Sequence, residues 1–268
     1  MKTICIKTNN ENAIEYLLKM LKNYNLEDVR FSCKKFKVFK NIFIHYKGSN
    51  LKIFLFNISE ILSFLVLELY EKDIVNRILS TDYFYFNQTE KSEILLKYNN
   101  LNYEDRETIS CKMEKLTKIF FNLLEQNNKL YLKGTITFRL SEYIKNLQSQ
   151  IDSTVNQYLI EKEYNEFVSL LKIYINNEPC KTDLVHLIYN NNSIVLLDKN
   201  KTIIKTDSNI LNAKYLSDIT FSDSDIVLNT LLNLIPKKIY LHLVNKQVDE
   251  FITTLKLIFE NRIVLCTD

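Results

Sequence analysis

Glycine is the residue whose scarcity most constrains this chain, because only Gly48 and Gly134 occur among its 268 residues. Average usage would give roughly 7% glycine. Phosphate-binding loops, nucleophile elbows and type I′ hairpins depend on glycine, since it adopts positive φ and permits close backbone approach without steric cost. The sequence therefore excludes every glycine-rich nucleotide-binding or nucleophile motif.

The rest of the composition is that of a folded globular protein. Hydrophobic residues make up 46% and charged residues 25% of the chain, whereas disordered chains combine low hydrophobicity with high net charge. The length fits one large domain or two small ones. The five cysteines lie far apart, without the spacing of a zinc or redox site, so we expect reduced and mostly buried thiols.

Neither a targeting signal nor a membrane segment is predicted. The N-terminal residues MKTICIKTNNEN lack the apolar core of a signal peptide. The longest apolar stretch, residues 53–70, is interrupted by polar residues and falls short of the ~18 apolar residues that a membrane span needs. Together with the cysteine pattern, these features predict a cytoplasmic protein.

Hydrophobic periodicity predicts an α+β fold with sheet at both ends of the chain and helices between them. Residues 1–58 are predicted to form a β-α-β-β-β unit whose last strand covers residues 51–57. Residues 59–178 are predicted to be helical, with a long helix near 141–175 that ends before Pro179. These regions, with the C-terminal one, are either separate units or one continuous globule.

Residues 179–268 are predicted to form a mixed α/β unit. The apolar runs at 183–189 and 193–197 flank three asparagines and indicate a hairpin. A strand at 238–243, a helix at 246–260 and a strand at 263–266 indicate a crossover, which would make the two strands parallel and the connection right-handed.

The histidines are the first candidates for chemistry, because histidine is the usual general base and metal ligand. His45, His186 and His242 all lie inside apolar strand patterns, so the simpler interpretation places each on the polar face of a strand or hydrogen-bonded near the core. The alternative is a metal site across one sheet, formed by Asp183, His186 and His242. Zinc sites usually contain closely spaced ligand pairs, which this sequence lacks. We therefore predict no catalytic residue and no cofactor, and the balance of the sequence is against an enzyme.

A basic stretch runs from Arg30 to Lys52, and no acidic residue occurs between Asp28 and Glu60. Phenylalanines and Tyr46 are interleaved with its cations, so the stretch could neutralise phosphates while its rings stack on bases. The alternative, which we prefer, is a sheet with buried aromatics and solvated lysines that protect an edge strand. The candidate nucleic-acid residues are Arg30, Lys34, Lys35, Lys37 and Lys40.

Several short motifs in the second half of the chain resemble the YtxC-like family of sporulation proteins. They are Lys133-Gly134, Thr137–Leu140 with Tyr143 and Ile144, Tyr158-Leu159 with Glu161–Phe167, Leu170–Lys172, Asp183–His186 and Leu196–Asp198. The resemblance implies a protein of endospore-forming bacteria that is associated with sporulation. It implies no established activity, ligand or catalytic residue.

The motif Glu161–Phe167 combines charge and aromatic side chains on one helix, which is more than core packing requires. We predict that it is a docking surface for a protein partner during sporulation; the alternative is a half-buried helix. The function predicted from the sequence is thus a non-catalytic interaction or regulatory protein, and the alternatives are a nucleic-acid binder and a metal-dependent hydrolase. The candidate partner-binding residues are Arg139, Glu161, Lys162, Glu163, Tyr164 and Glu166.

Overall fold

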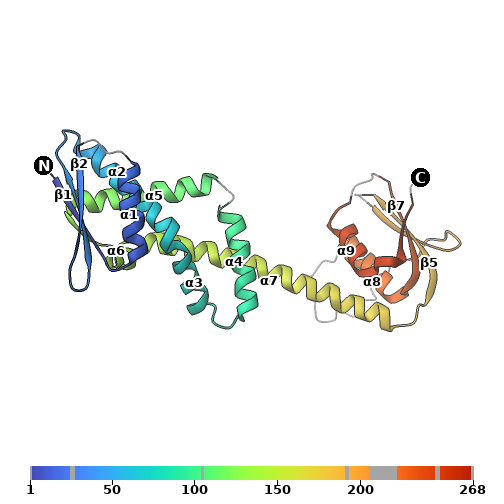
Figure 1. Cartoon of the computed structure of the whole chain (residues 1–268). Helices are drawn as coiled ribbons and strands as arrows, with labels where there is room; N and C mark the ends of the chain where they lie inside the picture. Colours follow the sequence, from blue (N-terminus) through green and yellow to red (C-terminus); the bar gives the residue numbers. More distant parts are fainter. Residues whose placement is uncertain are drawn as a thin grey trace. The chain divides into compact units, whose positions relative to one another are not determined.

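The computed structural model describes residues 2–24, 28–103, 106–190, 193–205, 222–244 and 248–266 of the chain (Figure 1). The chain divides into two compact units, Met1–Leu159 and Ile160–Asp268. Each unit contains a four-stranded mixed sheet, and each has its own hydrophobic core. The predicted α+β class is confirmed.

The sheet of the first unit has the strand order β2-β3-β1-β4. Strands β1 (Lys2–Thr8) and β2 (Val29–Lys35) both pair antiparallel with β3 (Lys40–Tyr46), and helix α1 (Glu11–Asn23) connects β1 to β2. This arrangement is a split β-α-β unit with β3 inserted between two parallel strands. The short β4 (Lys129–Tyr131) extends the sheet by pairing parallel with β1.

The helices of the first unit lie on one side of this sheet (Figure 1). Helix α2 (Leu51–Leu65), a π-helical turn (Val66–Tyr70) and α3 (Glu71–Thr81) follow one another without a break. The remaining helices are α4 (Gln88–Tyr103), α5 (Arg106–Gln126), α6 (Leu132–Arg139) and α7 (Ser141–Asn177). The long helix predicted near 141–175 is confirmed as α7, which begins in the first unit and ends in the second.

The strand predicted over residues 51–57 is wrong, because these residues begin helix α2. The Asn50 side chain accepts a hydrogen bond from the Ile53 backbone N–H at 3.3 Å and caps the helix. The buried residues Phe54, Leu55 and Ile58 then follow helical spacing. Short apolar runs do not distinguish a strand from a buried helix, and here the cap decides in favour of the helix.

The continuous helix from Leu51 to Thr81 is, among the described residues, the one helix long and apolar enough to cross a membrane. Its most apolar window has a mean hydropathy of 1.8, and half of that window is buried inside the structure. Leu62, Leu65 and Val66 are fully inaccessible and belong to the first core, and α2 packs against α1 and α5. The helix is therefore a core element of the first unit.

The sheet of the second unit has the order β6-β5-β7-β8. Strands β5 (Thr182–Asn190) and β6 (Ser193–Asp198) form the predicted hairpin, and β7 (Pro236–Leu243) pairs parallel with both β5 and β8 (Ile263–Cys266). Helices α8 (Asp223–Leu234) and α9 (Glu250–Phe259) contribute to its core, and a single 3₁₀ turn (Glu260–Arg262) leads into β8.

The predicted crossover between β7 and β8 is confirmed. Helix α9 begins after Asp249, whose side chain accepts a hydrogen bond from the Ile252 backbone N–H at 3.0 Å. The sequence predicts that this helix starts at Lys246, which lies outside the described residues.

Candidate functional site

A buried ion pair occupies the centre of the helical part of the first unit. The Lys112 ammonium donates a hydrogen bond to Glu71 Oε1 at 2.6 Å, and these residues are 6% and 0% exposed. The Tyr143 hydroxyl donates to Glu71 Oε2, and the Tyr98 hydroxyl lies 3.4 Å from both Glu71 Oε1 and Lys112 Nζ. Helices α3, α4, α5 and α7 each contribute one of these side chains. The cluster therefore joins four helices at one point with its charges paired.

The π-helical turn explains why Glu71 faces the interior. The backbone N–H of Glu71 bonds to the carbonyl of Val66, an i to i−5 hydrogen bond. The wider turn inserts one residue into the helix and shifts all later side chains by about 100°. As a result the buried positions continue from Val66 to Glu71 and then to Ile74 and Val75.

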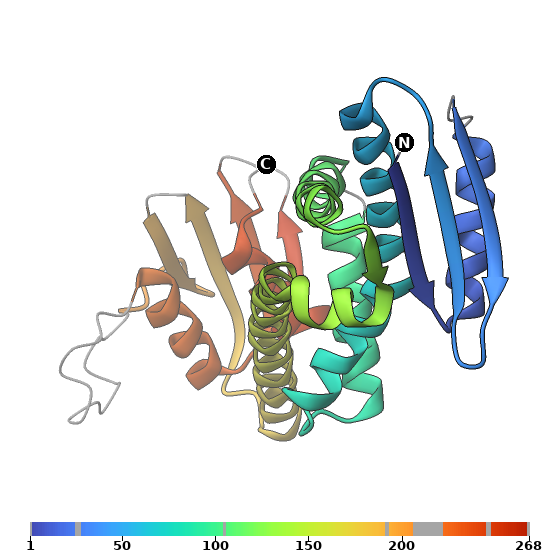
Figure 2. The same ribbon diagram turned by 90° about the vertical axis from the view of Figure 1, so that its left-hand side faces the viewer.

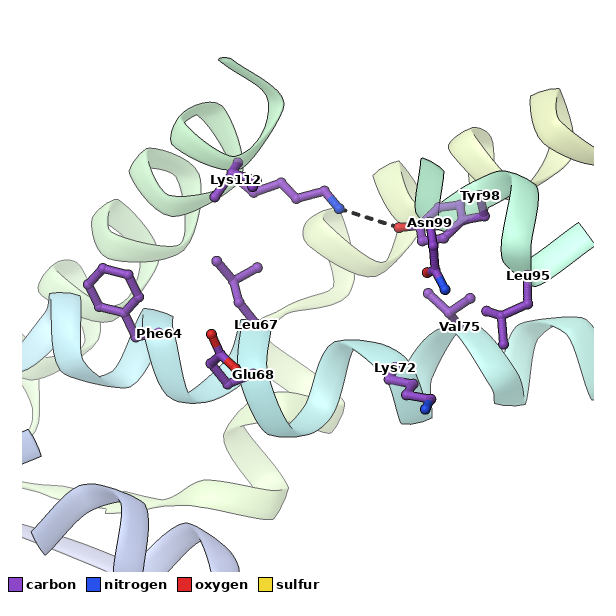
Figure 3. Close-up of a pocket in the computed structure, with 10 residues that line it drawn as sticks. Phe64, Leu67, Glu68, Lys72, Val75, Leu95, Tyr98, Asn99 and Lys112 are labelled. Atoms are coloured by element: carbon purple, nitrogen blue, oxygen red, sulfur yellow. Dashed lines mark hydrogen bonds between the residues drawn. The ribbon is translucent and has the colours of Figure 1, made fainter. Parts of the chain in front are cut away.

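A cavity of about 520 Å³ lies beside this cluster. Figure 3 shows the Lys112 ammonium and the Tyr98 hydroxyl pointing toward each other at one side of it, with Leu67, Val75 and Leu95 forming apolar walls. Its size is in the range of small-molecule pockets. Sequence reasoning missed this region, because Glu71 and Lys112 look like ordinary helix-surface charges and their burial depends on a turn that leaves no sequence motif.

The second unit brings together two of the three predicted metal ligands. His186 on β5 and His242 on β7 lie with Nδ1 and Nε2 3.1 Å apart and their ring centroids 5.4 Å apart. Burial lowers the pKa of the His186 imidazole, and His242 and Lys201 lower it further. Asp183 instead forms an exposed ion pair with Lys237 at 2.6 Å.

Across the described ranges of the chain, no three His, Cys, Asp or Glu side chains are grouped so that they could hold a metal ion. The metal site formed by Asp183, His186 and His242 stays a prediction, and only its two histidines are neighbours.

The predicted nucleic-acid residues are divided between the two faces of the first sheet. Alternation along β2 places Arg30 and Lys34 on the face away from the core, and Lys35 on the opposite face. Lys40 shares that opposite face and forms an ion pair with Glu11 of α1. Lys37 is exposed in the loop between β2 and β3.

The predicted partner-binding residues lie in different units. Arg139 is exposed at the end of α6 in the first unit. Glu161, Glu163 and Glu166 are exposed on α7 in the second unit, and Lys162 is partly exposed. Tyr164 is partly buried against the second core, with its hydroxyl 2.7 Å from the Thr254 hydroxyl of α9.

Helix α7 exposes more apolar surface than the sequence motif suggested. A group of large apolar side chains, here called the α7 stripe, recurs along its C-terminal half. The stripe consists of Ile160 (67% exposed), Phe167 (51%), Leu170 (64%), Ile173 (57%) and Tyr174 (40%).

All five cysteines are free thiols, but the expectation that most are buried is wrong. Only Cys5 is buried, Cys266 is partly exposed, and Cys33, Cys111 and Cys180 are exposed. Cys33 lies on the edge strand β2 and Cys111 on the outer side of α5, so neither reaches a core.

Comparison with known proteins agrees with the motifs in the second half of the chain. The sequence model of the YtxC-like family matches residues 56–264, which include α3 to α9, strands β5 to β7 and the beginning of β8. The protein described as uncharacterized protein YtxC of Bacillus subtilis (strain 168) is 20% identical over 182 residues, which cover 66% of this chain. The match spans 64% of that relative's own length. No solved structure matches the chain. The family match covers most of the sequence, and the chain therefore belongs to the YtxC-like family.

Proposed function

We propose that this chain is a non-catalytic interaction protein that acts in the cytoplasm during endospore formation, and that the α7 stripe is its docking surface. One observation carries the proposal: the C-terminal half of α7 presents large apolar side chains to solvent next to the face that it buries. Phe167 and Leu170 are 51% and 64% exposed, whereas Val168 and Ile175 are 5% and 1% exposed.

The spacing of the stripe matches a surface that a partner helix could cover. Phe167, Leu170 and Tyr174 follow one another at intervals of three and four residues, so they lie on one side of the helix. A helix at the surface of a globular protein normally buries one apolar side and presents polar residues on the other. A second apolar side indicates a binding surface more often than a solvated one.

The charges beside the stripe define the chemistry of the partner. Glu163 and Glu166 are exposed on the same helix turns as Phe167 and Leu170. Acidic side chains that flank an apolar stripe favour a partner with the opposite arrangement. We expect an amphipathic helix with an apolar side bordered by lysine or arginine.

The proposal is tested with the double variant Phe167→Glu and Leu170→Glu, expressed in a spore-forming host in place of the native chain. Leu96→Glu is the matched control, because Leu96 is equally exposed, at 65%, on a helix of the other unit. Both proteins are purified from sporulating cells with their bound partners, which are quantified by mass spectrometry. Heat-resistant spores are counted in parallel, and circular dichroism confirms folding.

The expected result is that the double variant loses one set of partners at least tenfold and forms fewer spores, while the control retains both properties. A synthetic peptide from the lost partner should carry the basic amphipathic pattern and bind the purified wild-type chain directly. If the double variant recovers the same partners in the same amounts and sporulates normally, the α7 stripe is not the docking surface.

A further inference from the structure

The first sheet has a face that the helices of its unit do not cover. The side chains of Ile4, Ile6, Ile42 and Ile44 point to the helices and are 0% exposed. The alternate side chains of the same strands lie on the opposite face, called the open face here. Figure 2 shows the strands β1, β2 and β3 in front of α1 and α2.

Strand register arranges the open face in three rows across the sheet. The first row contains Lys129, Cys5, Phe43 and Ser32. The second row contains Tyr131, Lys7, Asn41 and Lys34. The third row contains Thr3, His45 and Arg30. Each row therefore combines at least one cation with one aromatic or imidazole ring.

The charge on this face is of one sign. Lys7, Arg30, Lys34 and Lys129 are its four cations, and none of the positions in the three rows is acidic. None of these four cations belongs to an ion pair within the described part of the chain. Burial raises the pKa of the Cys5 thiol, and Lys7 and Lys129 counteract it, which places both lysines close to the centre of the face.

The rings lie where they could contact a flat ligand. Tyr131 is 41% exposed and is contacted edge to face by Phe39, with ring centroids 5.3 Å apart. The rings of Phe43 and His45 are parallel within 7°, with centroids 6.5 Å apart, on the central strand β3. Phe43 and His45 are both partly exposed.

We propose that the open face of the first sheet binds single-stranded nucleic acid. The four cations would contact successive phosphates, and the rings of Phe43 and Tyr131 would stack on unpaired bases. A base presents a planar π surface whatever its sequence, so such a site binds single strands with little sequence preference. A broad sheet does not enter a groove of duplex DNA as a helix or a two-stranded ribbon does, and stacking requires bases that are not already paired.

The proposed site differs from the basic stretch that the sequence contains. Two of its cations, Lys7 and Lys129, come from strands outside that stretch, whereas Lys35 and Lys40 lie on the opposite face. Strands β1 to β3 also lie outside the part of the chain that matches the YtxC-like family. The proposal is thus independent of the α7 stripe, and of its residues only Lys129 and Tyr131 of β4 lie inside the family match.

The experiment measures the binding of fluorescent oligo(U) and oligo(dT) by anisotropy across a series of salt concentrations. Both oligonucleotides have about 15 nucleotides, a length that covers one site of this kind. One variant carries Lys7→Ala, Arg30→Ala, Lys34→Ala and Lys129→Ala. The matched control carries Lys19→Ala, Lys22→Ala, Lys35→Ala and Lys52→Ala, which removes the same net charge from exposed lysines of α1, α2 and the other side of β2. Circular dichroism confirms that all proteins fold.

Wild type and control are expected to bind with a steep salt dependence. Each lost phosphate contact lowers the log–log salt slope by about 0.7 for a single strand, so the open-face variant should lose about 3 in slope. Phe43→Leu or Tyr131→Leu should weaken binding by roughly tenfold at constant slope, because each variant removes one ring on which a base stacks and no phosphate contact.

Three results would overturn the proposal. The wild type could fail to bind either oligonucleotide at low salt, or the control could lose as much affinity as the open-face variant. The face could also bind vesicles that contain anionic phospholipid while it ignores both oligonucleotides, which would assign it to a membrane surface instead.

Discussion

Removing the buried ammonium of Lys112 is the most direct test of the packing of the first unit. In the variant Lys112→Met, the Glu71 carboxylate keeps its 0% exposure and its tyrosine neighbours but loses the ammonium at 2.6 Å. Removing one partner of a buried ion pair typically costs about 3–5 kcal/mol, because the remaining charge loses the partner that offsets its desolvation. For a unit of this size the corresponding fall in melting temperature is about 6–20 °C.

The double variant Glu71→Leu with Lys112→Met distinguishes the ion pair from general packing. Replacing both ions by apolar side chains of similar volume is often close to neutral. The hydroxyls of Tyr98 and Tyr143 then lose an acceptor, which costs about 1–3 kcal/mol for each buried group. We therefore expect the double variant to be less destabilised than the sum of the two single variants by at least about 2 kcal/mol.

The assay is urea unfolding of the full-length chain, followed by circular dichroism, for the wild type and the three variants of this cycle. Lys115→Met, which removes an exposed lysine from the same helix, is the control and should change the free energy of unfolding by less than about 0.5 kcal/mol. The reasoning is refuted if Lys112→Met costs less than about 1 kcal/mol, or if the losses of the two single variants simply add.

Three further predictions concern other positions. Desolvation and His242 lower the pKa of the His186 imidazole in the folded protein below 6.5, so on acidification the unfolded chain binds a proton at a higher pH than the folded one. The free energy of unfolding should therefore fall as pH drops through 6.5. In the variant His186→Gln, urea unfolding should show a shallower dependence on pH. Glu260→Gly should raise the melting temperature, because Glu260 adopts the strained backbone angles φ 40° and ψ −114°. Relief of this backbone strain is worth about 1–3 kcal/mol, whereas the exposed ion pair of Glu260 with Lys172 contributes at most about 1 kcal/mol. Gly48→Ala should cost about 1–3 kcal/mol in urea unfolding, because a Cβ there would lie 2.4 Å from the hydroxyl of the buried Tyr46; an unchanged midpoint would contradict the close approach.

Local patterns were sufficient to predict much of the fold. The break before Pro179 and the alternation in β5 and β6 are both visible in short stretches of sequence. Helix α2 is the exception among the longer elements, because its short apolar run over residues 51–57 fits a strand as well as a buried helix. Strand β4 has only three residues, and its identity depends on pairing with β1 at the other end of the unit. No local pattern could indicate that pairing.

The site regions show the same division between local and distant information. His186 and His242 could be suspected of meeting, because both lie in strands predicted to share a sheet, and they are neighbours. The burial of Glu71 could not be predicted, because it requires the wider helical turn after Val66 and partners from three other helices. The open face likewise depends on which strands are adjacent, so the stretch from Arg30 to Lys52 indicated only part of it.

The pairing of β4 with β1 has a consequence for how the chain is synthesised. Strand β3 ends at Tyr46 and β4 begins at Lys129, so about 80 residues must be translated after β3 before β4 can pair with β1. Their synthesis takes about 4–16 s at ordinary translation rates. During that interval one edge of β1, whose Ile4 and Ile6 are destined for the core, has no strand beside it. An unprotected edge pairs readily with other chains, so nascent chains are most prone to aggregate between translation of β3 and β4.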